Sequence, residues 1–94
     1  MKAAEIARNA YGQAHIWTSE IYLYMALMYE EGGKSKLASP WIRRSFVSCY
    51  KAVGINHRAI KVVFTHLKLI EHNIRSNLAN VPMEFAAAKI NELE

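Results

Sequence analysis

The chain has 94 residues, of which 52% are hydrophobic and 21% charged, and its formal net charge is +4. This size and composition predict one globular domain and exclude both a disordered chain and the two-lobed architecture of most enzymes. A single cysteine excludes an intrachain disulfide and, beside four methionines, favours a reducing, cytoplasmic location. No apolar run suits a signal peptide or a membrane span, so we expect neither export nor membrane insertion.

The first predicted helix covers residues 3–31. Apolar side chains recur at spacings of three and four, and the main stripe comprises Ala3, Ala7, Ala10, Ala14, Trp17, Ile21, Tyr24 and Met28. We expect Trp17 and Tyr24 to pack in the core rather than to stack on bases. Other apolar residues lie off this stripe, leaving more apolar surface than one contact can bury. We therefore expect a homodimer or a subunit of a complex.

A loop at residues 32–38 follows, since its sequence is polar and rich in glycine. Ser39 as N-cap and Pro40 as first helical residue then begin a second, short helix. Gly54 ends this helix, because glycine readily adopts the conformations found just after helices.

Asn56 caps the third helix, which is the second long one and ends near Asn80. Pro82 opens a short fourth helix. No segment has the alternating pattern of a strand. The predicted fold class is all-α: a small four-helix assembly of two long and two short helices in a single domain, residues 1–94.

Residues suited to catalysis or metal binding are sparse. The chain has no Asp, and its Glu and His residues show no spacing that would pair carboxylates or build a metal site. Cys49 lies in the apolar stripe of the second helix, where a thiol without a cationic neighbour is inert. The sequence therefore predicts a non-catalytic protein with no cofactor and no metal.

One short pattern supplies a distant alternative. Arg8-Asn9 is followed by His15, seven residues after the arginine, so Arg8 and His15 lie on one helical face. This spacing resembles the Arg-polar-x-His motif of HEPN-type ribonucleases over eight residues. The resemblance implies that His15 acts as a base on a 2′-hydroxyl and that Arg8 stabilises the charge on the phosphorus. The family usually carries the motif near the end of a longer domain.

Positive charge is concentrated in residues 34–75. This segment has nine Lys and Arg residues against Glu71 alone, a balance of +8, whereas residues 1–33 and 76–94 are each at −2. Such a segment can follow phosphates without reading bases, as small helical subunits of nucleoprotein complexes do. A nucleic acid, either DNA or RNA, is therefore the expected partner.

Residues 45–68 also have the outline of a helix-turn-helix with its turn at residues 54–56, although any tight helical corner gives the same pattern. In that interpretation the start of the third helix faces the major groove, and the preceding helix contacts phosphates. The open alternative is an assembly or inhibitor module that docks an acidic protein surface. The candidate nucleic-acid-binding residues are Arg43, Arg44, Lys51, His57, Arg58, Lys61 and Lys68.

Overall fold

A computed structural model describes residues 16–93 of the chain. Over these residues it has four α-helices, one short 3-10 helix and no β-strand. They are α2 (Ile16–Glu31), α3 (Ser35–Val53), α4 (Arg58–Asn73), the 3-10 helix η1 (Asn77–Asn80) and α5 (Met83–Leu93). The predicted all-α, four-helix fold is confirmed. Within this part of the chain, no helix combines the length and the apolar character needed to cross a membrane.

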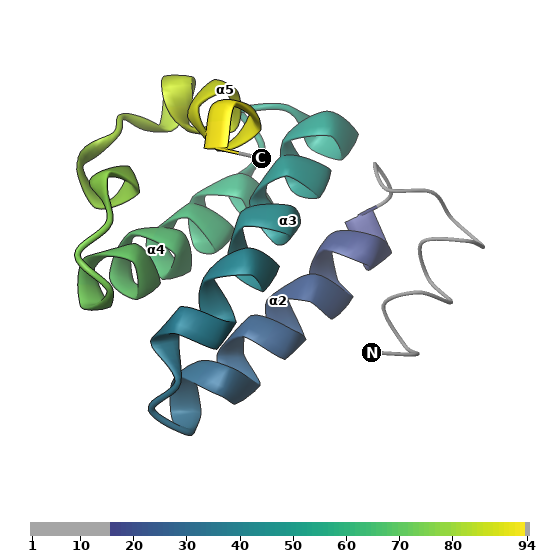
Figure 1. The fold of residues 1–94 in the computed structure, drawn as a ribbon. Helices are drawn as coiled ribbons and strands as arrows, with labels where there is room; N and C mark the ends of the chain where they lie inside the picture. Colours follow the sequence, from purple (N-terminus) through teal and green to yellow (C-terminus); the bar gives the residue numbers. More distant parts are fainter. Residues whose placement is uncertain (1–15, 94) are drawn as a thin grey trace.

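Helix α3 lies between α2 and α4, and it contacts both along their lengths (Figure 1). Helix α5 and η1 complete the assembly, α5 packing against α3 and η1 against α4. The core is aromatic where α3 meets α4: the Phe46 ring lies 5.8 Å from Phe64 and 6.4 Å from Tyr50, centroid to centroid. Burial of each such side chain stabilises the fold by roughly 1.5–3 kcal/mol.

Helix α3 begins at Ser35, four residues before the predicted start at Ser39, so that prediction is wrong. Pro40 is the sixth residue of the helix rather than its first. A proline at this position removes the N–H that would bond to the carbonyl of Lys36, and its ring crowds that carbonyl; the residue Lys36 is exposed. The early start extends α3 by one turn and shortens the predicted loop.

His57, and not the predicted Asn56, caps α4. Its ring Nδ1 accepts a hydrogen bond from the backbone N–H of Ala59 at 3.0 Å, and α4 starts at Arg58. This bond satisfies one of the N–H groups that a helix leaves free at its start. Gly54, with φ 80°, ends α3 as the sequence predicts.

Helix α4 ends at Asn73, about two turns before the predicted end near Asn80. Arg75 adopts the left-handed conformation, with φ 58°, that usually requires glycine. The N–H of Ser76 then bonds to the carbonyl of Glu71 at 2.8 Å, which closes the helix end in a Schellman arrangement. The chain turns away from the helix axis and continues into η1.

The buried face of α2 is opposite to the predicted stripe. Trp17 and Tyr24, which the sequence analysis places in the core, are 53% and 73% exposed, so this prediction is wrong. Met28, from the same stripe, is 63% exposed. The buried residues are Thr18, Ser19, Tyr22 and Ala26.

A reciprocal pair of serine hydrogen bonds explains this orientation. The Ser19 hydroxyl of α2 donates to the carbonyl of Ser45 of α3, and the Ser45 hydroxyl donates to the carbonyl of Ser19, both at 2.8 Å. Two small side chains let the helix backbones approach each other, and each buried hydroxyl finds an acceptor. Because α2 is apolar around most of its circumference, these polar contacts select the buried face.

Candidate nucleic-acid interface

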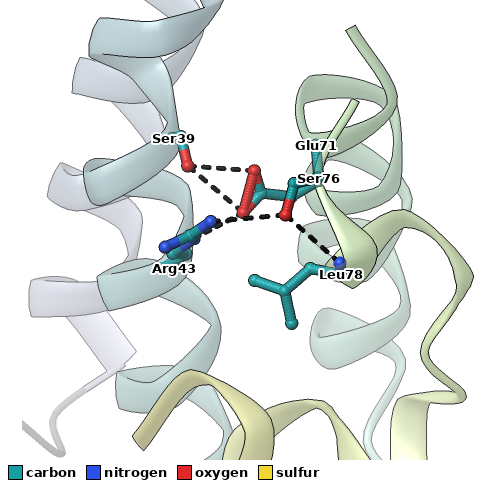
Figure 2. Close-up of polar contacts among 5 residues, drawn as sticks. All are labelled: Ser39, Arg43, Glu71, Ser76 and Leu78. Carbon is teal, nitrogen blue, oxygen red and sulfur yellow. Dashed lines mark hydrogen bonds and ion pairs between the residues drawn. The ribbon is translucent and has the colours of Figure 1, made fainter. Parts of the chain in front are cut away.

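The only acidic residue of segment 34–75 is buried between α3 and α4 (Figure 2). The carboxylate of Glu71, on α4, accepts hydrogen bonds from the Ser39 hydroxyl at 2.9 and 3.2 Å and from Nε of Arg43, both on α3. Arg43 Nη2 also reaches the Ser76 hydroxyl oxygen at 3.5 Å, and this oxygen accepts the N–H of Leu78 at 3.2 Å. We call these residues the Glu71 cluster. Every buried oxygen of the cluster has a partner, as burial of a charge requires.

Pairing within the Glu71 cluster leaves the other bases of the segment uncompensated. Arg43 and Glu71 neutralise each other, and their side chains are only 20% and 0% exposed. None of the other bases forms an ion pair within residues 16–93. All eight are exposed: Lys34, Lys36, Arg44, Lys51, Arg58, Lys61, Lys68 and Arg75. The +8 balance of the segment therefore lies entirely at the surface.

Helix α4 presents an uninterrupted basic stripe to solvent. Arg58, Lys61, Lys68 and His72 are all exposed. Their spacings of three, seven and four residues place them within about 80° of the helix circumference, over a length of about 21 Å. Thr65 lies among them, also exposed, and its hydroxyl donates to the carbonyl of Lys61 at 2.9 Å. No acidic side chain interrupts the stripe, since the one acid of α4 points inward.

Helix α3 adds bases on the same side of the molecule. Ser39, near the start of α3, bonds to Glu71, near the end of α4, and Phe46 further along α3 meets Phe64 earlier in α4, so the two helices run in opposite directions. On each helix, the bases lie roughly 50–130° around the helix axis from the residues that form the α3–α4 contact. Viewed from the N-terminus of each helix, the direction of this rotation is the same. For antiparallel helices that rotation leads to one common side. We call the combined set the basic face; it comprises Lys36, Arg44 and Lys51 of α3 and Arg58, Lys61, Lys68 and His72 of α4.

Two of these cations lie over aromatic rings. The guanidinium of Arg44 is 4.9 Å from the centroid of the Trp41 ring, and the Lys68 ammonium is 5.8 Å from that of Phe64. Such contacts orient a cation without neutralising its charge. Trp41 in turn packs against Tyr22 of α2 at 5.9 Å, so the orientation of Arg44 depends on the α2–α3 contact.

Five of the seven residues predicted from the sequence belong to the basic face: Arg44, Lys51, Arg58, Lys61 and Lys68. Arg43 is directed inward to Glu71. His57 is exposed, but its Nδ1 serves as the cap of α4. His72 belongs to the stripe but was not predicted from the sequence. It lies fourteen residues after Arg58, about four helical turns, and this spacing would have placed both on one face of the helix.

The junction of α3 and α4 has the local geometry of a tight helical corner. Residues 54–57 form the turn, and the exposed Arg58 and Lys61 lie in the first turn of α4. Tyr50, where a helix-turn-helix has a small residue, is half-buried with its ring against Phe46. The corner brings Lys51 and Arg58 to the same end of the molecule.

Elsewhere in residues 16–93 no cluster of three or more His, Cys, Asp or Glu side chains can hold a metal ion. Cys49 is buried, and burial raises the pKa of its thiol; a hydrogen bond with Ser19 lowers the pKa and the charge of Glu20 raises it. Such a thiol stays protonated and unreactive at neutral pH. Arg8 and His15, the residues of the ribonuclease-like pattern, lie outside the described residues.

An apolar depression lies on the outer side of α2, away from the basic face. It is lined by Trp17, Glu20, Ile21, Leu23, Tyr24 and Leu27. Apolar surface of this kind on a small domain usually marks a contact with another molecule.

Comparison with protein-family models, with curated proteins and with solved structures finds no match to this chain.

Proposed function

We propose that this chain is a small, non-catalytic helical protein that binds nucleic acid through the basic face. The observation that carries the proposal is that six of the eight exposed, uncompensated bases that remain after Arg43 and Glu71 pair in the interior lie together on the basic face. Each Lys or Arg that meets a phosphate releases condensed counterions, which supplies most of the affinity of such proteins. A cytoplasmic location belongs to the proposal, because the single cysteine forms no disulfide within the chain and is buried.

The dimensions of the basic face suit a polyphosphate. The α4 stripe extends over about 21 Å, and nucleotides along one strand of a duplex rise by about 3.4 Å each, so the stripe matches about six of them. Two binding modes are compatible with this arrangement. Either the first turn of α4 enters a groove, as in a helix-turn-helix, or both helices follow phosphates as a nucleoprotein subunit does.

The test is a salt series of binding to labelled duplex DNA, single-stranded DNA and RNA, followed by fluorescence anisotropy. The logarithm of the binding constant should fall linearly with the logarithm of salt concentration. The double variant Lys61→Gln/Lys68→Gln should lose affinity and lower the slope on duplex DNA by about two. The matched control is Lys89→Gln on α5, because Lys89 lies off the basic face and pairs with Glu92 at 3.5 Å. Unchanged affinity in the double variant, or no dependence on salt, would refute the proposal.

The alternative is that the same face docks an acidic protein in an assembly or inhibitor complex. Val62 and Leu69, on α4, are 54% and 52% exposed beside the basic stripe. Apolar side chains among charges are common in protein interfaces. Failure to bind any nucleic acid at low salt, with capture of an acidic protein that survives nuclease treatment, would favour this alternative.

We further propose that α2 forms a homodimer through its exposed stripe. The spacings between Trp17, Ile21, Tyr24 and Met28 are four, three and four, a pattern that is unchanged on reversal. Two copies of α2 packed antiparallel about a two-fold axis therefore place Trp17 against Met28 of the second copy and Ile21 against Tyr24 of the second copy. Trp17, Tyr24 and Met28 expose roughly 400 Å² together, which suits a weak dimer.

Light scattering of the full chain tests the dimer. The wild type should be dimeric at high concentration, and Tyr24→Glu should be monomeric while it keeps its affinity for nucleic acid. A monomeric wild type would rule out the dimer.

A further inference from the structure

The aromatic side chains of the described residues are placed where they cannot stack on bases that approach the basic face. The exposed ones, Trp17 and Tyr24 on α2 and Phe85 on α5, lie on other helices. On α3 and α4 the rings are buried or half-buried, and two of them lie beneath Arg44 and Lys68. Proteins that bind single strands combine a basic groove with exposed aromatic rings. The basic face has the charge of such a site, but its only exposed ring is the imidazole of His72, and it has no exposed Trp, Tyr or Phe ring on which bases can stack.

Helix α4 instead offers aliphatic side chains in line with its cations. Val62 and Leu69 are seven residues apart and more than half exposed, with Thr65 and its methyl group between them. All three lie within about 60° of the helix circumference and border the basic stripe. Aliphatic groups gain nothing from phosphates. They can contact thymine methyl groups on the floor of a major groove, where Lys and Arg also bond to guanine O6 and N7.

The dimensions of α4 select among duplexes. A helix of 16 residues is about 24 Å long and 10–12 Å across, which fits a B-form major groove of about 12 Å width. The major groove of an A-form RNA duplex is too deep and narrow for side chains to read. The face of α4 has no acidic side chain to meet the phosphates at either rim.

We infer that the nucleic acid is duplex B-form DNA and that α4 lies along its major groove, with Val62, Thr65 and Leu69 over base edges. In this arrangement Arg58, Lys61 and Lys68 bond to bases or to the near phosphates. Arg44 and Lys51 of α3 contact the backbone outside the groove, as the first helix of a two-helix reader does. The inference rests on the proposed function and specifies its ligand.

The first experiment compares a duplex DNA, its single strand and the duplex RNA of the same sequence at one salt concentration. Duplex DNA should bind at least about tenfold more tightly than either competitor. Bound protein should also protect guanine N7 in the major groove from methylation by dimethyl sulfate.

The second experiment uses the surface variant Val62→Ser/Leu69→Ser, which should keep the fold because both side chains are more than half exposed. Its affinity for duplex DNA should fall about fivefold while its salt slope stays unchanged, because no phosphate contact is removed. Leu93→Ser on α5, at 52% exposed, is the matched control.

The outcomes separate the inference from the proposed function. Equal or tighter binding to single strands or duplex RNA, or duplex DNA binding without N7 protection, would overturn the inference and leave the proposed function standing. An unchanged affinity of the Val62→Ser/Leu69→Ser variant would likewise overturn the groove contact. If no nucleic acid binds at low salt, both fail together.

Discussion

The Glu71 cluster yields a quantitative prediction about stability. Replacing Glu71 by Ala leaves Arg43 Nε and the Ser39 hydroxyl without their acceptor at a site where Glu71 and Ser39 are buried. Loss of one partner of a buried ion pair costs about 3–5 kcal/mol. Because the Arg43 side chain is 20% exposed and can regain some solvation, we expect about 3 kcal/mol, near the lower limit. A domain of this size then melts roughly 12–24 °C lower.

A double-mutant cycle isolates the pair from other effects of truncation. Arg43→Ala leaves a buried carboxylate with the Ser39 hydroxyl as its remaining partner in the cluster, and should destabilise by a similar amount. The double variant Arg43→Ala/Glu71→Ala removes both charges, so its loss should be smaller than the sum of the single losses by about 1.5 kcal/mol or more. Urea unfolding followed by far-UV circular dichroism measures all three.

The control for this cycle is Glu31→Ala, an exposed acid at the end of α2, which should change stability by less than about 0.5 kcal/mol. Losses that add within about 0.5 kcal/mol, or a loss below about 1 kcal/mol for Glu71→Ala, would refute the reasoning. Arg43→Ala should also keep its affinity for nucleic acid below its melting temperature, since Arg43 is directed inward.

Four further predictions concern the helix ends and the thiol. Gly54 has φ 80° and ψ −179°, a region nearly restricted to glycine, so Gly54→Ala should cost about 1–3 kcal/mol in urea unfolding although no atom obstructs the added Cβ. Arg75→Gly should stabilise by about 0.5–1 kcal/mol, because glycine adopts the left-handed conformation without strain. His57→Ala, which removes the cap bond to Ala59, should destabilise the fold by about 1 kcal/mol. For each of these three variants, an unchanged urea midpoint would contradict the backbone conformation or cap bond described at that residue. Cys49 should react with a thiol reagent no faster than the chain unfolds, and rapid labelling of the native protein would show that the thiol is accessible. Because burial raises the pKa of Cys49 in the folded state, its contribution to stability should be full at neutral pH and decline as the pH rises into the alkaline range.

The sequence predicts the core of α3 and α4 well. Cys49 of α3 is buried as predicted, and the apolar residues at helical spacing from it, Ile42 and Phe46, are buried too. On α4 the apolar residues Ile60 and Leu67, seven positions apart, are likewise buried. In both helices most residues of the opposite face are polar, apart from Val62 and Leu69 of α4, so a period near 3.6 identifies the buried stripe. Periodicity fails on α2, which is apolar on nearly all sides. Its buried face includes Thr18 and Ser19, which hydrophobicity alone assigns to solvent.

The helix ends depend on features that local propensity does not contain. Pro40 is a strong signal for a helix start, yet it lies inside α3 as the sixth residue of the helix. The end of α4 depends on a left-handed arginine, Arg75, where the general preference is for glycine.

The interface was predictable in its charge but not in its geometry. Counting bases locates the positive segment, and every base in it except Arg43 is exposed. The partner of Arg43 is Glu71, 28 residues away on another helix, and only tertiary structure brings the two together. The exposed position of Val62 and Leu69 depends equally on how α4 packs.

The basic face also affects the thermodynamics of the free protein. Two like charges about 10 Å apart repel by about 0.4 kcal/mol in water, and eight uncompensated cations on one small domain multiply such terms. Salt screens this repulsion, and a polyanion that binds only the folded state opposes it directly. When its free concentration is a hundred times its dissociation constant, such a ligand adds about 2.7 kcal/mol to the free energy of unfolding. If the proposed partner binds only the folded state, folding and binding are linked equilibria, and the most stable form is the one whose basic face is occupied.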